Sequence, residues 1–206
     1  ASDVDPGTFQ FDFAVKNYEL KKGTPDADKH GLAESSKGQH IHFIVNNGPY
    51  RAKYKSSFEA TMDEPGYYTV FSFLSRSYHE SVKNPNAFAI KQFKVGNPEE
   101  GMQADLSKPH LFYSRPKGTY GQGDYDKLLL DFYPVNVDTM GENSYKVKAT
   151  INDSTAFTFT EHKPYVIEGL EAGEVSVKLQ LMNGNDELVD SKYNEVTRNV
   201  RLKGSM

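Results

Sequence analysis

The strongest constraint on the fold is an internal repeat. Residues 50–96 align with residues 157–203 at a constant offset of 107 and without a gap. Upstream, residues 41–47 align with residues 147–153 at an offset of 106. Identity between the copies is low, but the hydrophobic residues keep their positions. Repetition of this kind indicates two similar units, so both halves of the chain should have the same fold.

Each copy has the pattern of short strands separated by turns. In the second copy Val175, Val177 and Leu179 alternate with polar residues, which is typical of a sheet with one buried and one solvated face. Turn residues such as Asn46-Asn47-Gly48-Pro49 interrupt the apolar runs. The expected strands are 9–15, 40–46, 50–54, 57–62, 67–74 and 87–95 in the first copy, and 128–135, 145–151, 156–160, 164–168, 174–182 and 194–202 in the second.

These patterns predict an all-β protein of two tandem immunoglobulin-like antiparallel β-sandwich domains that arose by internal duplication. We expect the first domain at 1–96, with a long insertion at 16–39, and the second at 128–206. Residues 97–127 are expected to be a linker rich in aromatic residues, Pro and Gly. Because long loops without secondary structure are uncommon, both the insertion and the linker should pack on the sandwiches.

Composition excludes several classes of protein. The net charge of −4 and the pI near 5.9 argue against nucleic acid as the main partner. No apolar run approaches the ~18 residues of a transmembrane segment. The absence of Cys excludes disulfides and thiolate metal sites. The chain begins at Ala1 rather than Met, as expected of an exported protein whose signal peptide has been removed. The oligomeric state is not indicated.

One face of the first copy departs from the alternating pattern. Ile41, Phe43 and Val45 continue the core phase of the second copy, so the opposite face should be polar. Monomers rarely expose a large apolar patch, so this face is either covered by the insertion, the linker or the second copy, or it binds a partner or ligand. Its residues are His40, His42, Ile44, Tyr67, Phe71, Phe73, Phe88 and Ile90.

Two histidines on this face form a candidate metal site. His40 and His42 lie two apart on an expected strand, so both imidazoles leave the same side. With His79 as a third ligand they could hold Zn or Cu. The equivalent positions in the second copy are Lys146 and Lys148, so the site would belong to the first copy alone. The alternative is a hydrogen-bonded structural pair with no cofactor.

Two Ser-Arg segments, 75–79 and 114–120, form a candidate surface for an anionic or phosphorylated ligand or a protein partner. Arg76 and Arg115 could hold a phosphate, sulfate or carboxylate, and Tyr78 could stack on a sugar or peptide, as could Tyr120. Phe71 and Phe73 would line the same surface. The alternative is that the arginines tie the linker to the first sandwich through backbone carbonyls.

No catalytic motif accompanies these candidates. The chain has no GxSxG, HExxH or P-loop sequence. We therefore expect a protein that is not an enzyme.

Three segments resemble an uncharacterised exported family of Bacteroidetes. They are His40 to Tyr50, Phe73 to Ser81 and Pro109 to Tyr120, and the resemblance extends over nearly the whole chain. Members of this family often carry the label phosphopeptide-binding protein. The resemblance implies an exported, non-enzymatic protein that is periplasmic, on the cell surface or a lipoprotein, and it supplies no site residues.

The sequence thus predicts an exported binding or docking module whose ligand or partner surface lies on the first copy and the linker. Two alternatives stay open at this point. One is a Zn- or Cu-binding module, and the other is a passive structural component of an envelope complex.

Overall fold

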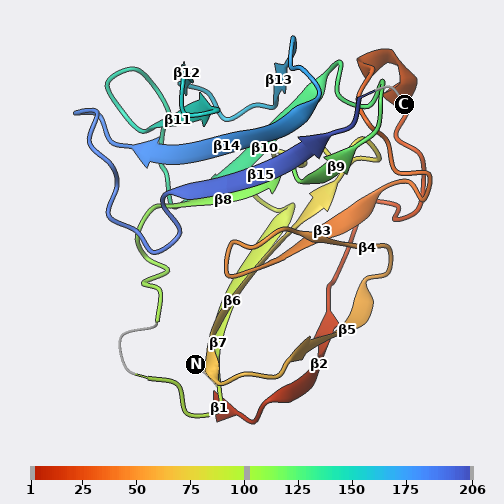
Figure 1. Cartoon of the computed structure of the whole chain (residues 1–206). Helices are drawn as coiled ribbons and strands as arrows, with labels where there is room; N and C mark the ends of the chain where they lie inside the picture. Colours follow the sequence, from red (N-terminus) through yellow and green to blue (C-terminus); the bar gives the residue numbers. More distant parts are fainter. Residues whose placement is uncertain (1–2, 100–102, 205–206) are drawn as a thin grey trace.

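The computed structural model describes residues 3–99 and 103–204, and their strands form four sheets (Figure 1). In the first copy, one sheet has the order β1 (Asp3–Val4), β7 (Phe88–Val95), β6 (Gly66–Ser75), β3 (His40–Val45) and β4 (Arg51–Lys53), and the other pairs β2 (Gly7–Asp12) with β5 (Ser57–Met62). In the second copy, one sheet has the order β12 (Thr155–Phe159), β11 (Lys146–Ile151), β14 (Gly173–Met182), β15 (Val196–Leu202) and β9 (Gly118–Tyr120), and the other has β13 (Tyr165–Ile167), β10 (Leu128–Val135) and β8 (His110–Arg115).

Strand pairing confirms the fold class and the duplication. Ile41 of β3 pairs with Leu74 of β6, and the equivalent pair in the second copy is Val147 and Leu181. Both registers follow the offsets of 106 and 107 that the sequence predicts. Each large sheet also has a short parallel strand at its edge, because β1 pairs with β7 as β9 pairs with β15. The two copies therefore share their topology as well as their hydrophobic phase.

The predicted phase of the first copy is also confirmed. Ile41 is 2% exposed and Phe43 is fully buried. Phe43 packs with Val70 and Val95 against the β2–β5 sheet, where Phe11 lies 4.9 Å from it between ring centroids. Alternate residues of β3 thus face a core of their own, and the intervening residues face away from it.

The segment expected to be a linker contains two strands of the second sandwich. β8 pairs with β10, and β9 pairs with β15. Leu111 and Tyr113 face the core of the second copy, whereas Phe112 between them faces the first copy. All six residues of β8 are buried. A strand covered on both sides lacks alternation, which explains why the apolar residues of this segment did not reveal a strand in the sequence.

The apolar face of the first copy is covered by β8 and β10. Ile44, Phe71 and Phe73 form one buried cluster with Phe112 and Tyr133 of the second copy. The rings of Phe71 and Phe112 are stacked with centroids 4.2 Å apart. We call this contact the inter-copy interface. The four sheets consequently lie in layers, with the β8–β10–β13 sheet between the large sheets of the two copies (Figure 1).

Buried hydrogen bonds fix the position of the two copies relative to each other. The Asn47 amide donates to the Leu111 carbonyl at 2.9 Å, and its oxygen accepts from the Tyr113 amide at 3.0 Å. The Arg198 guanidinium donates to the carbonyls of Gly48 and Asn47 at 2.8 and 3.1 Å. These bonds fix the turn after β3 against the second copy.

The 16–39 insertion contains a short 3₁₀ helix, η1 (Ala27–His30), and is tied to the turn after β6. Thr24 and Ser77 exchange two hydrogen bonds between backbone amide and hydroxyl, at 2.9 and 3.2 Å. The insertion thus packs on the first copy, as expected. In the part of the chain described, no helix has the length and apolar character needed to cross a membrane.

We predict that Phe71→Ala lowers the free energy of unfolding by about 3–5 kcal/mol, because it opens a cavity in the interface. Chemical denaturation measures the change. Phe157→Ala is the control, since Phe157 is 48% exposed and its loss should change stability by less than about 0.5 kcal/mol. Equal effects of the two substitutions would contradict a buried interface.

Candidate metal centre

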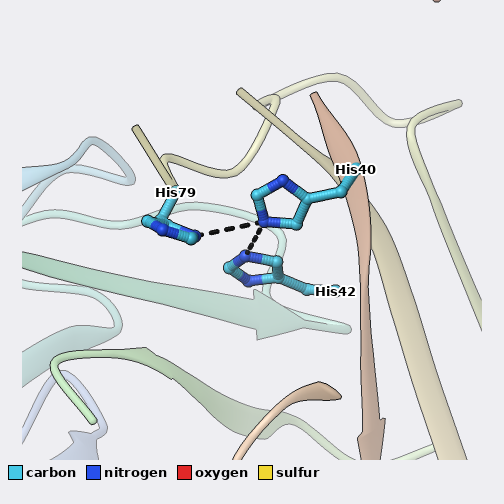
Figure 2. Close-up of side chains that lie close together, drawn as sticks. All are labelled: His40, His42 and His79. Carbon is cyan, nitrogen blue, oxygen red and sulfur yellow. Dashed lines mark hydrogen bonds between the residues drawn. The ribbon is translucent and has the colours of Figure 1, made fainter. Parts of the chain in front are cut away.

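Three histidines converge at one end of the inter-copy interface (Figure 2). His40 and His42 leave the same side of β3, and His79 reaches them from the turn after β6. The Nε2 atom of His40 lies 3.0 Å from Nε2 of His42 and 3.1 Å from Nδ1 of His79. One ligand atom from each ring lies within 4.8 Å of the other two. The structure therefore brings together the three metal ligands predicted from sequence.

The turn that carries His79 has an unusual backbone conformation. His79 has a φ of 71°, in the left-handed region that non-glycine residues seldom occupy. Its amide donates to the Arg76 carbonyl at 3.0 Å, and the Arg76 amide donates to the Glu80 carbonyl at 2.9 Å. The Arg76 side chain also pairs with Glu80 at 3.4 Å. The local strain is balanced by these bonds, and the result is an imidazole aimed at β3.

Neighbouring groups fix the orientation of two rings. The Nδ1 of His40 lies 2.8 Å from the Gly38 carbonyl, which can only accept, so this nitrogen carries the proton. The position of this carbonyl depends on Gly38 being glycine. Its φ is 76°, and a Cβ would lie 2.6 Å from the carbonyl oxygens of Lys21 and Lys22. The Nδ1 of His42 bonds to the Ser114 hydroxyl of β8 at 3.1 Å.

The proton arrangement leaves a lone pair pointing into the cluster. Because Nδ1 of His40 is protonated, its Nε2 is an acceptor that faces both His42 and His79. The Tyr50 hydroxyl also lies 3.1 Å from Nδ1 of His79. If this hydroxyl donates its proton to Nδ1 of His79, that nitrogen is an acceptor. Neither it nor Nε2 of His40 then carries a proton for the contact between them. In that arrangement the lone pairs of His40 and His79 face each other across 3.1 Å, and a cation between them would bind both.

All three imidazoles are held neutral at physiological pH. Burial, assisted by the charge of Arg115, lowers the pKa of His40 to about 4 and that of His79 to about 2. Burial likewise lowers the pKa of His42 well below its usual value, assisted by the two neighbouring histidines. Neutral imidazoles are the form that binds metal, so the site needs no proton release from these groups near pH 7.

Two cations lie beside the histidines. Arg115 is 8% exposed and donates to the Tyr120 hydroxyl at 2.7 Å. The Lys117 ammonium donates to the Tyr50 carbonyl at 2.8 Å and lies 4.1 Å from the centroid of the Tyr50 ring. Positive charges oppose a bare dication, and they favour a metal ion that also carries an anionic ligand.

The residues predicted to form a ligand surface are not gathered on one open face. Tyr78 is 4% exposed and packs against the ring of His30 at 4.5 Å between centroids. Tyr120 is buried against Arg115, and Phe71 and Phe73 lie inside the interface. Arg76 is 40% exposed in its side chain but is paired with Glu80. Their role in ligand binding stays a prediction.

Two partners of the histidines were not predicted from sequence. Tyr50 and Ser114 contact His79 and His42, respectively. The ring of Tyr50 stacks on that of His42 with centroids 3.5 Å apart. No spacing rule connects position 114 to positions 40–42, because the contact arises only when β8 covers the first copy.

No known family model matches the chain, and no curated protein matches it. Among solved structures it is similar to fibronectin(III)-like modules of CbhA from Clostridium thermocellum, with 11% identity, coverage of 98% of this chain and 88% of that one, and a TM-score of 0.35. It is also similar to the extracellular domain of a hybrid two-component system from B. thetaiotaomicron, with 10% identity, 84% and 32% coverage and a TM-score of 0.36. A third similar structure is the BSP domain of a biofilm-associated protein, with 10% identity, 99% and 29% coverage and a TM-score of 0.29. At these TM-scores the likeness carries no argument about function.

We predict that the metal-free protein loses stability as the pH falls from 7 to 5. The folded pKa values of His40 and His79 lie below the usual value of 6.5, so their stabilising effect is complete above pH 6.5 and is lost as the pH falls toward the folded values. Each histidine should contribute a loss of roughly 2 kcal/mol over this range.

Chemical denaturation at the two pH values in the presence of a chelator measures this loss. Part of it should disappear in His40→Phe, which cannot be protonated, and it should persist in His30→Ala, which removes an exposed histidine. An unchanged pH dependence in His40→Phe would show that the cluster does not titrate as expected.

Proposed function

We propose that this chain is an exported, non-enzymatic module that binds one transition-metal ion, Zn²⁺ or Cu²⁺, through His40, His42 and His79. The observation that carries the proposal is the convergence of three neutral imidazole nitrogens within 4.8 Å of one another. Three histidines are a common ligand set for both metals.

The spacing of the nitrogens supports this assignment. Ligands of a tetrahedral zinc ion at about 2.0–2.1 Å lie roughly 3.3 Å from one another. Two separations in the cluster are 3.0 and 3.1 Å and the third lies within 4.8 Å, so metal entry requires the rings to shift. Such movement is easiest for His79, which is only partly buried and lies on a turn.

The groups behind the ligands support it as well. Metal-bound histidines usually donate their other ring proton to a carbonyl or bond to another polar group, which fixes the ring. The Gly38 carbonyl has this relation to His40, and the Ser114 hydroxyl has it to His42. A site with three protein ligands leaves a fourth position open.

The charges around the open position indicate its ligand. Arg115 lowers the pKa of His40 and His79 through its charge, and Lys117 does the same. Both would be favourable neighbours of an anion bound to the metal. An anionic ligand, as predicted from sequence, would have the charge that these two cations favour.

We predict that the wild-type protein takes up one equivalent of Zn²⁺ or Cu²⁺ and that His42→Ala weakens binding by at least about 100-fold. Isothermal titration of chelator-treated, untagged protein measures both. Metal at 100 times the dissociation constant should also stabilise the wild type by about 2.7 kcal/mol.

His30→Ala is the matched control for this titration, because His30 lies near the same turn but outside the cluster. Its binding should equal that of the wild type. A wild-type protein that takes up neither metal would contradict the proposal and favour a purely structural histidine cluster, as in a passive component of an envelope complex.

A further prediction concerns the Ser114 hydroxyl, which bonds to the Nδ1 of His42. Ser114→Ala should lower metal affinity by about 10–100-fold while leaving the stoichiometry at one, because His42 loses the group that orients its ring. The same titration measures the effect. Unchanged affinity would show that β8 does not support the ligand set.

A further inference from the structure

A second buried polar cluster also joins the two copies, and its Asp131 pairs across the strands with Arg115. The Lys83 ammonium lies 2.6 Å from Oδ1 of Asp131. Lys83 follows the turn after β6 in the first copy, and Asp131 lies on β10 of the second. The Asp131 side chain is fully buried, and that of Lys83 is 18% exposed. The pair is therefore an inter-copy contact between an amine and a carboxyl group with little access to water.

Two aromatic side chains lie on one side of this pair. Lys83 lies over the ring of Tyr133 at 5.6 Å from its centroid. His162 packs edge-on against the same ring at 4.7 Å, and burial lowers its pKa to about 4, so it adds no positive charge at neutral pH. In such surroundings two full charges are costly, and a neutral product of the same two groups is favoured.

We propose that Lys83 and Asp131 form an intramolecular amide bond that covalently links the two copies. One proton passes from the ammonium to the carboxylate along their hydrogen bond. The neutral amine then attacks Cγ of the carboxylic acid, the N–C bond forms, and one C–O bond breaks. The departing oxygen leaves as water with a second amine proton, so the reaction needs no oxidant or co-reactant.

The surrounding groups already match the hydrogen bonds of the product. Each carboxylate oxygen has a donor from Ser81, because the hydroxyl bonds Oδ1 at 2.9 Å and the amide bonds Oδ2 at 3.3 Å. One of these two oxygens remains as the carbonyl of the amide, and in either case it still accepts a hydrogen bond from Ser81. The Phe132 carbonyl lies 3.2 Å from the Lys83 nitrogen and can accept the remaining N–H. The Ser81 hydroxyl also contacts that nitrogen.

The arrangement is specific to the interface. Phe11 pairs with Phe58 as Leu130 pairs with Tyr165, so the next residue, Asp131, corresponds to Asp12 of the first copy. The Asp12 side chain is exposed and bonds to Gln10. The chain has no Cys, so a disulfide cannot join the copies. An amide between Lys83 and Asp131 would supply a covalent link by other means.

The test is the mass of the unfolded wild-type protein together with tandem mass spectrometry of its protease digest. We expect a mass lower than that of the sequence by one water molecule, and a branched peptide that contains both Lys83 and Asp131. Lys83→Arg keeps the positive charge but cannot form the amide, so it should show the full sequence mass and no branched peptide.

Lys146→Arg is the matched control. Lys146 is also buried and lies 2.7 Å from a carboxylate oxygen of Asp186, but Asp186 is 77% exposed, so that pair should remain an ion pair. Its mass should show the same loss of water as the wild type. A wild-type protein at full sequence mass without the branched peptide overturns the proposal, and it does so whether or not the protein binds metal.

Discussion

The packing of the first copy's large sheet on the β8–β10 sheet determines most of what is distinctive in this molecule. Phe71 and Phe112 stack at its centre, and Tyr133 closes it on one side. Burial of these rings removes a large apolar area from water, which is the dominant favourable term in such contacts. Because the covering strands are themselves part of the second sandwich, the two copies share one buried interface instead of being joined by a free linker.

This interface also creates the chemistry of the histidine cluster. His40 and His42 lie on the same side of β3 as Ile44, so they are enclosed by the contact that buries the apolar residues. Enclosure lowers their pKa values and keeps them neutral. The interface brings Ser114 to His42 as well. Apolar packing and the polar site are therefore two results of one arrangement.

Much of the fold could be predicted from the sequence because the same alternation of apolar and polar residues occurs in both copies. The alternation at Val175, Val177 and Leu179 fixed the phase that Phe43 and Val70 then followed, and their burial confirms it. The strands β8 and β9 were not predicted. Residues of β8 are buried on both faces, so the alternation that marks a strand is missing there.

The candidate metal site could be predicted in part, because two of its ligands lie on one strand. The spacing of His40 and His42 depends only on local strand geometry, which sequence shows directly. Tyr50, Ser114 and Asp131 enter their clusters through contacts between distant segments. Their side chains carry no local pattern that distinguishes them from ordinary polar residues, so only the assembled structure identifies their roles.

The second copy shows what the same strand becomes where no other sheet of the described residues packs on its outer face. Lys148 stands at the position of His42 and is exposed, while Lys146, at the position of His40, pairs with Asp186. The backbone pairing at these positions is the same in both copies. Since the strand is equivalent, the difference lies in the covering sheet, which only the first copy receives. The histidine cluster of the first copy therefore depends on the second copy, whose strand β8 encloses it and supplies Ser114.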